Sequence, residues 1–583
     1  MAAVLRNTGP GGANVIALDA ICKLAGIQDQ PGLALLQGLP LVGEVETITG
    51  HSTSAEPTAA ATISVETLAN IDTAQDPRVR AALGGPSPAA RQPDVAEAIW
   101  ESTKAEIGLH LLDDPVDFSE CQQRRGPLTV RFGVKQLSSS GKEKVRAIDD
   151  FLASSVNAAT TINLKLHHDS VDDIIEATRQ LHRPDDPPRL TKADFKGAYR
   201  TVPLHPDQRH LAAILVYDTD RRRWVRTRQR ACPFGALSSV YHWDRIAAAM
   251  TSIARWMGLP IFRYVDDLFM SAPSSIAEDF KHALTEVIAA LGWCLEPSKT
   301  EGPLPQLTIL GLLITINDDD FTVHITPDPR KAPMWISHIE QLLHDRSCPP
   351  SDAEKLAGRL NFAGSSVYGK CGRDYLRALY RRQHERTTDI NPALQEALEW
   401  WVDFLRSENL HRIVPMTNDS TPPVLVYTDA EGKGGIGASI YDHLGNLLLW
   451  SASTIPPSYD DLLQPRQTQI NGYEILAAVW GAHIAHRHFP SRPMRLFIDN
   501  SAAENILRSG SSRSTDLSRL AGGFWIWTAV NDIVTYIHRV PSKSNPADGP
   551  SRGGRPPGAR IPATSCPLPS PKLLVHSRQP TLM

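Results

Sequence analysis

Apolar and polar residues divide the chain into five segments with different patterns. Residues 1–94 are rich in Ala, Gly, Pro and Thr, which is typical of a low-complexity linker, with a short helix expected at Ala17–Leu24. The periodicity then changes, giving a mixed α/β segment at 95–320, a basic helical segment at 321–415, a second α/β unit at 422–555 and a Pro-rich basic tail at 556–583.

The stretch FRYVDDLFM, Phe262–Met270, places two adjacent aspartates inside an apolar run. On both sides of the aspartates, apolar and polar residues alternate and β-branched and aromatic residues are frequent. This pattern predicts two short strands joined by a tight turn. Asp266 and Asp267 lie at that turn. Neighbouring carboxylates repel each other, and a divalent cation between them removes this cost. The alternative is an ordinary Asp-Asp hairpin tip, and this stretch alone leaves both interpretations open.

The composition is that of a globular chain and excludes few functions. Of 583 residues, 42% are hydrophobic and 21% are charged, and the formal net charge is -4. This sum does not exclude a nucleic-acid partner, because local basic patches decide such binding. The seven cysteines form no CxxC pair, so neither a zinc site nor a disulfide framework is predicted. No apolar run has membrane-spanning length and no signal-peptide pattern is present, so we expect an intracellular location, in cytoplasm or nucleus.

A third carboxylate lies upstream, in LTKADFKGAYRTVPLHP (Leu190–Pro206). Asp194 ends a short extended run before a Gly-containing turn. Three carboxylates from two strands are able to hold two Mg²⁺ ions, the arrangement used for in-line nucleotidyl transfer. Asp194 alone carries little information, because aspartate commonly begins a turn.

The motifs between about Val95 and Arg382 resemble, in order and spacing, those of reverse transcriptases. They are KVRAIDDFLASSVN, ADFKGAYRTVPLHP, ACPFGALSS, YVDD, and LGWCLEPSKTE followed by LTILGLLI. The resemblance implies a right-hand polymerase with fingers, palm and thumb. It also implies an RNA template, a DNA primer, dNTPs, and two Mg²⁺ (or Mn²⁺) ions at the active site.

The resemblance gives roles to individual residues. Asp194, Asp266 and Asp267 become the metal-binding catalytic carboxylates. Tyr199 becomes an aromatic gate beneath the sugar, against which a 2′-hydroxyl clashes. Phe234 stands where retroviral enzymes usually carry glutamine, and many retrotransposon enzymes have phenylalanine there. The residues expected to contact the nucleotide are Arg146, Lys144, Tyr199, Phe234, Gly235 and Tyr264.

Other basic residues suit a nucleic-acid path. Lys299 is a candidate to protonate the pyrophosphate leaving group, and Lys135 to assist Arg146. The run RRRWVRTRQR (Arg221–Arg230) and the basic helices at 321–415 are candidates for phosphate contacts, which give affinity without sequence reading. The alternative for these runs is a solvated charged face.

Four acidic residues of the second α/β unit are candidates for a second site, three of them at the ends of predicted strands or helices. They are Asp429, Glu474, Asp499 and Asp548. Their set and order resemble the RNase H fold of retroelements, which implies a second two-metal site that cuts the RNA strand of an RNA–DNA hybrid. Retroviral enzymes place a histidine in the loop before the last aspartate, whereas PSKSNPAD has none. His538 precedes this loop and is expected to be structural.

The motifs together predict an α/β (α+β) multidomain chain, a right-hand polymerase followed by an RNase H-like domain. A linker at Met416–Pro423 is expected to join the two. The predicted function is RNA- and DNA-directed DNA synthesis with a linked ribonuclease H, serving retrotransposon replication. The motifs are most similar to those of DIRS-like and related eukaryotic retroelements. The alternative is a decayed or domesticated element that binds nucleic acid without catalysis, against which seven intact acidic residues argue. An intron- or telomerase-type enzyme is disfavoured because those normally lack the RNase H unit.

Overall fold

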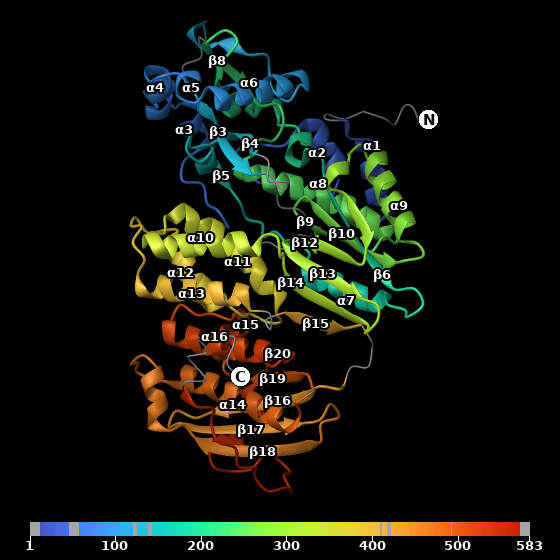
Figure 1. Cartoon of the computed structure of the whole chain (residues 1–583), viewed down its shortest axis with the longest axis vertical. Helices are drawn as coiled ribbons and strands as arrows, with labels where there is room; N and C mark the ends of the chain where they lie inside the picture. The colour runs from blue at the N-terminus through green and yellow to red at the C-terminus, as the bar shows by residue number, and fades with distance from the viewer. Residues whose placement is uncertain are drawn as a thin grey trace. The chain divides into compact units, whose positions relative to one another are not determined.

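The computed structural model describes residues 12–45, 58–120, 125–137, 143–407, 411–416, 421–490 and 492–571 (Figure 1). Residues 417–420 of the predicted linker lie outside them. The chain folds into two compact units, and each has its own apolar core. The first unit comprises Met1–Ala177 and Pro188–Leu304, and the second comprises Thr178–Pro187 and Pro305–Met583.

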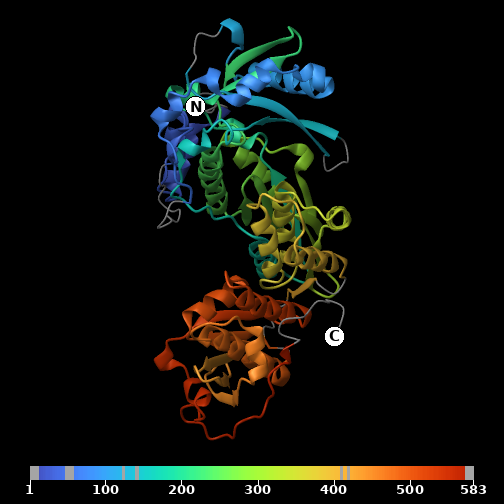
Figure 2. The ribbon, with the colours of Figure 1, turned by 90° about the vertical axis from the view of Figure 1, so that its left-hand side faces the viewer.

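The N-terminal segment forms helices that belong to the core of the first unit, which corrects our expectation of a linker over residues 1–94. Leu18, Cys22 and Leu35 are fully buried in one apolar cluster with Trp243. Apolar residues recur at helical spacing there, so one face of these helices is covered while the other meets solvent. The two dark blue helices that carry Leu18, Cys22 and Leu35 lie beside α8 (Leu237–Trp256) in both views (Figures 1 and 2). The helices are α1 (Val15–Leu24), which confirms the predicted short helix, α2 (Pro31–Gln37), α3 (Val65–Ala69), α4 (Pro77–Gly84), α5 (Pro88–Arg91) and α6 (Pro93–Gly108).

A four-stranded antiparallel sheet, here called the palm sheet, lies next to these helices in the first unit. Its order is β11-β6-β10-β9. The predicted hairpin at the two aspartates is confirmed, because β9 and β10 pair with Tyr264 opposite Asp267. Buried residues of the sheet share a core with α8 and α9. The elements are β6 (Pro188–Asp194), β9 (Ile261–Tyr264), β10 (Asp267–Pro273), β11 (Glu301–Leu304) and α9 (Ala277–Ala290).

A five-stranded sheet, here called the fingers sheet, completes the first unit with the order β2-β8-β7-β3-β4. Helix α4 packs on one of its faces through Val79 and Ala82, and α6 packs on the other through Val95 and Ile99. Its strands are β2 (Val116–Asp117), β3 (Thr129–Leu137), β4 (Glu143–Asp149), β7 (Ala213–Asp218) and β8 (Arg223–Arg228), and the short η5 (Ala198–Thr201) follows β6.

The second unit begins with a small sheet and a helical bundle. The sheet has the order β12-β13-β14-β15, and the helices pack around the buried side chain of Trp401. Trp400 stacks on Tyr375 with 4.5 Å between ring centroids. The elements are β12 (Gln306–Ile309), β13 (Leu312–Asn317), β14 (Thr322–Pro327), β15 (Arg412–Pro415), α10 (Ala332–Asp345), α11 (Pro350–Ala363), α12 (Arg373–Arg382) and α13 (Pro392–Arg406).

A mixed five-stranded sheet ends the second unit, with the order β18-β17-β16-β19-β20. Strand β17 runs antiparallel to both of its neighbours, β18 and β16, and β19 and β20 run parallel to β16. Helix α14 is apolar on all sides, as expected of a helix buried between layers. The elements are β16 (Val424–Ala430), β17 (Gly435–Tyr441), β18 (Leu447–Thr454), α14 (Ile470–His488), β19 (Met494–Ile498), α15 (Ser501–Ser509), α16 (Thr515–Val530), β20 (Thr535–Arg539) and α17 (Asp548–Ser551).

The mixed α/β multidomain fold predicted from the sequence is therefore confirmed. None of the helices in the described part of the chain combines the length and apolarity needed to cross a membrane.

Candidate active sites

The palm sheet brings together the three acidic residues of the first predicted site. Asp194 is the last residue of β6 and pairs directly with Asp267, the first residue of β10. Asp266 precedes Asp267 in the two-residue turn, and its carbonyl accepts a hydrogen bond from the backbone N–H of Phe195 (3.3 Å). The antiparallel register thus holds the carboxylates of two strands at one end of the sheet.

The turn that carries Asp266 has an unusual backbone. Val265 adopts φ 54°, a left-handed conformation that is strained for a β-branched residue. Its carbonyl accepts hydrogen bonds from Trp243 Nε1 (3.2 Å) and Arg263 Nη1 (2.8 Å), which hold it in place. Strain that the surroundings maintain is frequent at functional sites.

The electrostatics of this site favour a bound cation. Burial, followed by repulsion from Asp194, raises the pKa of Asp266. Burial by neighbouring groups, followed by repulsion from Asp266 and Asp194, raises the pKa of Asp267 to about 6. A divalent cation would remove this repulsion, so the donor set fits a metal site. Lys299 Nζ lies 2.9 Å from Asp194 Oδ2 and supplies a positive charge there.

The predicted sugar gate lies against the predicted nucleotide loop. The ring of Tyr199, in η5, meets Phe234 edge-on, with 5.1 Å between centroids, and Phe234 is 56% exposed. Gly235 has φ 91°, and a Cβ at this position would lie 2.8 Å from the carbonyl oxygen of Asp149. Only glycine fits this close approach. Asn157 fixes the loop by donating to the Gly235 carbonyl (2.9 Å) and accepting from the N–H of Leu237 (2.8 Å).

The remaining predicted nucleotide contacts lie on two strands. Lys144 and Arg146 are exposed on β4, without an ion-pair partner in the described ranges. Lys135 instead pairs with Asp94 of α6, with 2.7 Å between Nζ and Oδ2. Tyr264 ends β9, and its ring lies 4.9 Å from that of His168. Among the described residues of the β3–β4 hairpin, Lys144 and Arg146 are therefore the cations without an ion-pair partner.

The C-terminal sheet brings together three of the four acidic residues of the second predicted site. One carboxylate oxygen each from Asp429, Glu474 and Asp499 lie within 4.8 Å of one another, and all three residues are buried. Asp429 lies near the end of β16, Glu474 faces it from α14, and Asp499 directly follows β19. Within the described residues, Asp194, Asp266 and Asp267 do not form a set as compact as this one.

In the described part of the chain, none of the three carboxylates of this buried acidic cluster forms a salt bridge. Burial, with repulsion from Asp429 and Asp499, raises the pKa of Glu474 to about 9, and burial raises that of Asp429 to about 6. Glu474 Oε2 is buried without a hydrogen-bond partner in the described part of the chain. Buried polar atoms are normally satisfied, so an orphaned carboxylate oxygen beside two more carboxylates fits a divalent cation.

The fourth predicted acidic residue lies at the edge of this cluster. Asp548 begins α17 and is 43% exposed at its side chain, and it pairs with Arg552 (2.7 Å). Helix α17 approaches β17 closely because Gly437 has no side chain. A Cβ at this position would lie only 2.5 Å from the backbone nitrogen of Ser551. Ser551 Oγ donates to Asp429 Oδ2, a contact that sequence reasoning missed. Ser551 is remote from Asp429 in sequence. The only sequence feature that could have pointed to its role is its position three residues after Asp548.

Two other predictions have structural outcomes. His538 lies in β20 and stacks on Phe497 (5.2 Å), in line with a structural role. The arginine-rich run at Arg221–Arg230 is less available to nucleic acid than expected. Arg223 is paired with Asp117 (2.6 Å) and Arg226 is buried, because β8 is an interior strand of the fingers sheet.

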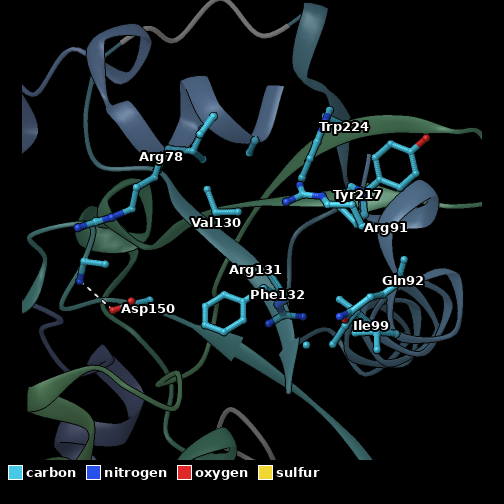
Figure 3. Close-up of a pocket in the computed structure, with 18 of the residues that line it drawn as sticks. Arg78, Arg91, Gln92, Ile99, Val130, Arg131, Phe132, Asp150, Tyr217 and Trp224 are labelled. Carbon is cyan, nitrogen blue, oxygen red and sulfur yellow. Dashed lines mark hydrogen bonds between the residues drawn. The ribbon is translucent and has the colours of Figure 1, made fainter. Parts of the chain in front are cut away.

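The first unit also contains a cavity of about 510 Å³ between α4, α5, α6 and β3 (Figure 3). Val130 and Phe132 form part of its apolar wall, and Arg78 and Arg91 lie at its margin. None of the acidic residues predicted to hold metal lines it. The cavity is therefore separate from both carboxylate sites.

Comparison with known proteins finds a family match for the segment that contains the first of these sites. Residues 127–314 match the family model described as "Reverse transcriptase (RNA-dependent DNA polymerase)". No curated protein is significantly similar to the chain in sequence.

Among the solved structures that resemble the chain are those of a foamy viral protease-reverse transcriptase. The protein in its complex with dsDNA has 13% sequence identity to this chain and a TM-score of 0.41. The match covers 93% of this chain and 96% of that chain. Its complex with an RNA/DNA hybrid is 14% identical with TM-score 0.40, and covers 81% of this chain and 55% of that chain. The matched segment, 127–314, contains Asp194, Asp266 and Asp267 together with the pairing of β6 and β10. The segment 127–314 therefore matches a reverse transcriptase domain.

Proposed function

We propose that the chain copies RNA and DNA templates into DNA and degrades the copied RNA, as part of retrotransposon replication. The observation that carries this proposal is the pairing of Asp194 with Asp267 at the end of the palm sheet, inside the segment that matches the reverse transcriptase family. The compact cluster of Asp429, Glu474 and Asp499 supports the linked ribonuclease H.

In the polymerase site, Asp194, Asp266 and Asp267 would hold Mg²⁺ or Mn²⁺. When bound, two such ions neutralise charge on the transferring phosphates and favour ionisation of the attacking hydroxyl. The protein's own part is positioning. Arg146 and Lys144 extend from β4 as free cations and bind the triphosphate, where the planar guanidinium gives bidentate contacts.

The sugar is selected by shape. Tyr199, braced by the edge of Phe234, leaves no room for a 2′-hydroxyl and so excludes ribonucleotides. The Asn157 hydrogen bonds hold the Phe234–Gly235 loop beside the end of β4. The gate and the triphosphate cations therefore stand on elements that touch each other.

In the ribonuclease site, Asp429, Glu474, Asp499 and the more exposed Asp548 would hold the metal. Ser551 orients the Asp429 carboxylate by donating a hydrogen bond to it. The partners of the whole chain would be an RNA template, a DNA primer, RNA–DNA hybrid and dNTPs. The retroelement would be of DIRS-like type, and the chain would act in the cytoplasm or the nucleus.

The proposal is tested by primer extension on an RNA template with Mg²⁺ or Mn²⁺, with the DNA primer and the RNA labelled separately. The wild-type chain should extend the primer and shorten the RNA, and Asp266→Asn should lose extension. Asp279→Asn, the same substitution at an exposed position of α9, is the matched control. Hybrid binding without either activity would instead identify the decayed, binding-only alternative.

A further inference from the structure

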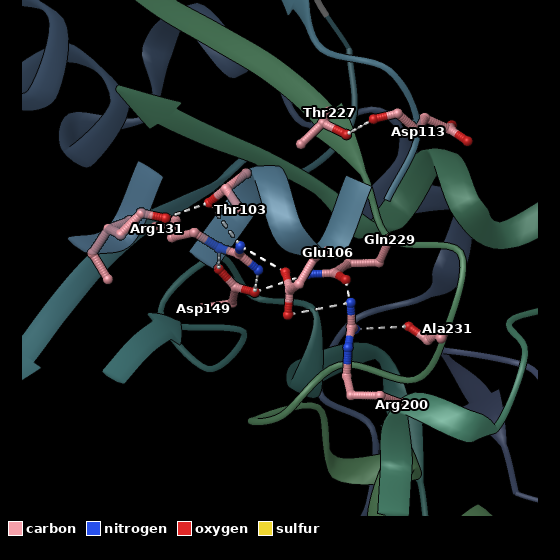
Figure 4. A network of polar contacts seen from close by, with 10 residues as sticks. Thr103, Glu106, Asp113, Arg131, Asp149, Arg200, Thr227, Gln229 and Ala231 are labelled. Carbon is pink, nitrogen blue, oxygen red and sulfur yellow. Dashed lines mark hydrogen bonds and ion pairs between the residues drawn. The ribbon is translucent and has the colours of Figure 1, made fainter. Parts of the chain in front are cut away.

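A buried network of charged and polar side chains lies in the first unit, away from both carboxylate sites (Figure 4). Arg131 is its centre. The guanidinium contacts Asp149 through two hydrogen bonds (Nε–Oδ1 2.9 Å, Nη2–Oδ2 2.8 Å) and Glu106 through a third (Nη1–Oε2 2.8 Å). Thr103 Oγ1 also accepts from Nη1 (3.1 Å). The Arg131 side chain is only 2% exposed.

The network continues to a second arginine through one amide. Gln229 Nε2 donates to Asp149 Oδ2 (2.8 Å), and Gln229 Oε1 accepts from Arg200 Nη1 (2.7 Å). Arg200 Nη2 also lies 3.5 Å from Glu106 Oε1, as an ion pair. Two cations are thus balanced by two carboxylates in a largely buried ring, a geometry in which removing one partner leaves an uncompensated buried group.

Three of the segments joined here carry or adjoin the proposed nucleotide contacts. Asp149 ends β4, three residues after Arg146, and Arg200 directly follows Tyr199 in η5. Gln229 follows β8 and leads into the loop of Phe234, and Glu106 lies on α6, which carries none of these contacts. The Asp149 carbonyl also faces Gly235, as the close approach described above requires.

We propose that Glu106, Arg131, Asp149, Arg200 and Gln229 form a positioning network that sets the distance between the triphosphate cations on β4 and the sugar gate in η5. These residues act through Arg146 and Tyr199 and are not catalytic residues themselves. The inference rests on the proposed function. It assigns to helix α6, in the N-terminal part of the chain, a role in selecting the nucleotide.

The test uses two variants of the full chain and one control. Glu106→Gln keeps the size of the side chain and removes its charge, and Gln229→Leu removes the bridge between Asp149 and Arg200. Glu101→Gln is the control, because it makes the same change on the exposed face of α6, where Glu101 pairs with Lys104. KM and kcat are measured for dCTP and CTP, per active enzyme from the burst amplitude, at a temperature where each variant is folded.

Both variants should raise KM for dCTP on the order of tenfold and reduce the preference for dCTP over CTP, with kcat changed much less. Glu101→Gln should behave as the wild type. Unchanged KM and unchanged preference in both variants, even with a lower melting temperature, overturn the inference and leave a structural role only. If Gln229→Leu does not fold, Glu106→Gln decides alone, because Glu106 is the most exposed charged member of the network.

Hydrogen exchange on the chain without nucleotide separates this inference from the proposed function. Glu106→Gln should speed exchange both in residues 143–149 and in residues 198–201, although neither segment contains the substitution. Faster exchange confined to α6 overturns the positioning role whether or not the chain polymerises. A wild type that fails to extend a primer, with the coupled exchange present, counts against the proposed function alone.

Discussion

Asp194 and Asp267 are directly opposed residues of neighbouring antiparallel strands, so their backbones fix the separation of their carboxylates. This relationship differs from that of Glu474 and Asp429, which meet across a helix and a strand inside the buried acidic cluster. The first arrangement remains open to solvent at Asp267, and the second is closed. The two sites are therefore expected to bind metal with different consequences for stability.

Replacing Tyr199 with valine should admit ribonucleotides. The aromatic wall that rests against Phe234 is lost, so the 2′-hydroxyl no longer clashes, and the preference for dCTP over CTP should fall on the order of tenfold or more. Tyr199→Phe keeps the ring and is the matched control, with the wild-type preference expected. An unchanged preference in the valine variant would locate the gate elsewhere.

Metal should stabilise the C-terminal sheet through Glu474. Without metal, Glu474→Gln should melt at or above the wild-type temperature, because the raised pKa of the buried Glu474 carboxyl lowers folding stability at neutral pH and the amide does not titrate. With Mg²⁺ at ten times its Kd, the wild type should gain about 1.4 kcal/mol and the variant much less. Thermal melting with and without EDTA measures both effects, and Glu399→Gln, on the exposed side of α13, is the control. An equal Mg²⁺ gain in all three proteins would remove Glu474 from the metal site.

Two adjacent arginines of α12 should have separable roles. Arg382 is 1% exposed at its side chain and donates to the carbonyls of Thr387 and Asp389, so Arg382→Met should lower stability by about 3 kcal/mol. Arg381 is exposed, so Arg381→Met should leave the melting temperature unchanged and weaken hybrid binding, more at low salt than at high salt. If Arg381→Met destabilises as much as Arg382→Met, this division is wrong.

A buried histidine should make the folded chain less stable as the pH falls. Burial lowers the pKa of His242 to about 4, and its Nε2 lies 2.7 Å from the carbonyl of Pro40. The unfolded state, with a pKa near 6.5, binds a proton first, so this stability is complete above about pH 6.5 and is lost as the pH falls toward 4. His242→Gln should flatten the melting profile between pH 6.5 and 4.5, by up to about 3 kcal/mol. The exposed His443→Gln should follow the wild-type profile.

Local features of the chain could be predicted well from the sequence. The hairpin around Asp266 and Asp267 follows from alternation over a few residues, and the mixed sheet of the C-terminal unit follows from strands and helices of ordinary length. Apart from α1, the helices of the N-terminal segment were not predicted, because an Ala- and Gly-rich composition is shared by linkers and by helices that bury only a narrow face. Leu18 and Leu35 are buried only through contact with distant segments such as α8.

Contacts between distant segments account for the rest. Nothing near Arg131 indicates that it lies beside Glu106 and Asp149, because the network forms only after α6 has packed on the fingers sheet. In the same way, the Ser551 hydrogen bond to Asp429 depends on α17 reaching β17. The residues of both sites were found by motif, whereas the side chains that orient them required the structure.

The central claim is that two independent metal sites act on one substrate, and a double assay tests it most directly. Labelled RNA annealed to a labelled DNA primer is given to the wild type, Asp267→Asn and Asp499→Asn, after thermal melting has shown each to be folded. Asp267→Asn should lose primer extension, on the order of a hundredfold or more, and still cut RNA in a preformed hybrid. Asp499→Asn should leave the RNA at full length while the DNA strand grows, since sites that share no partners behave independently. Loss of both activities in either folded variant would contradict the account.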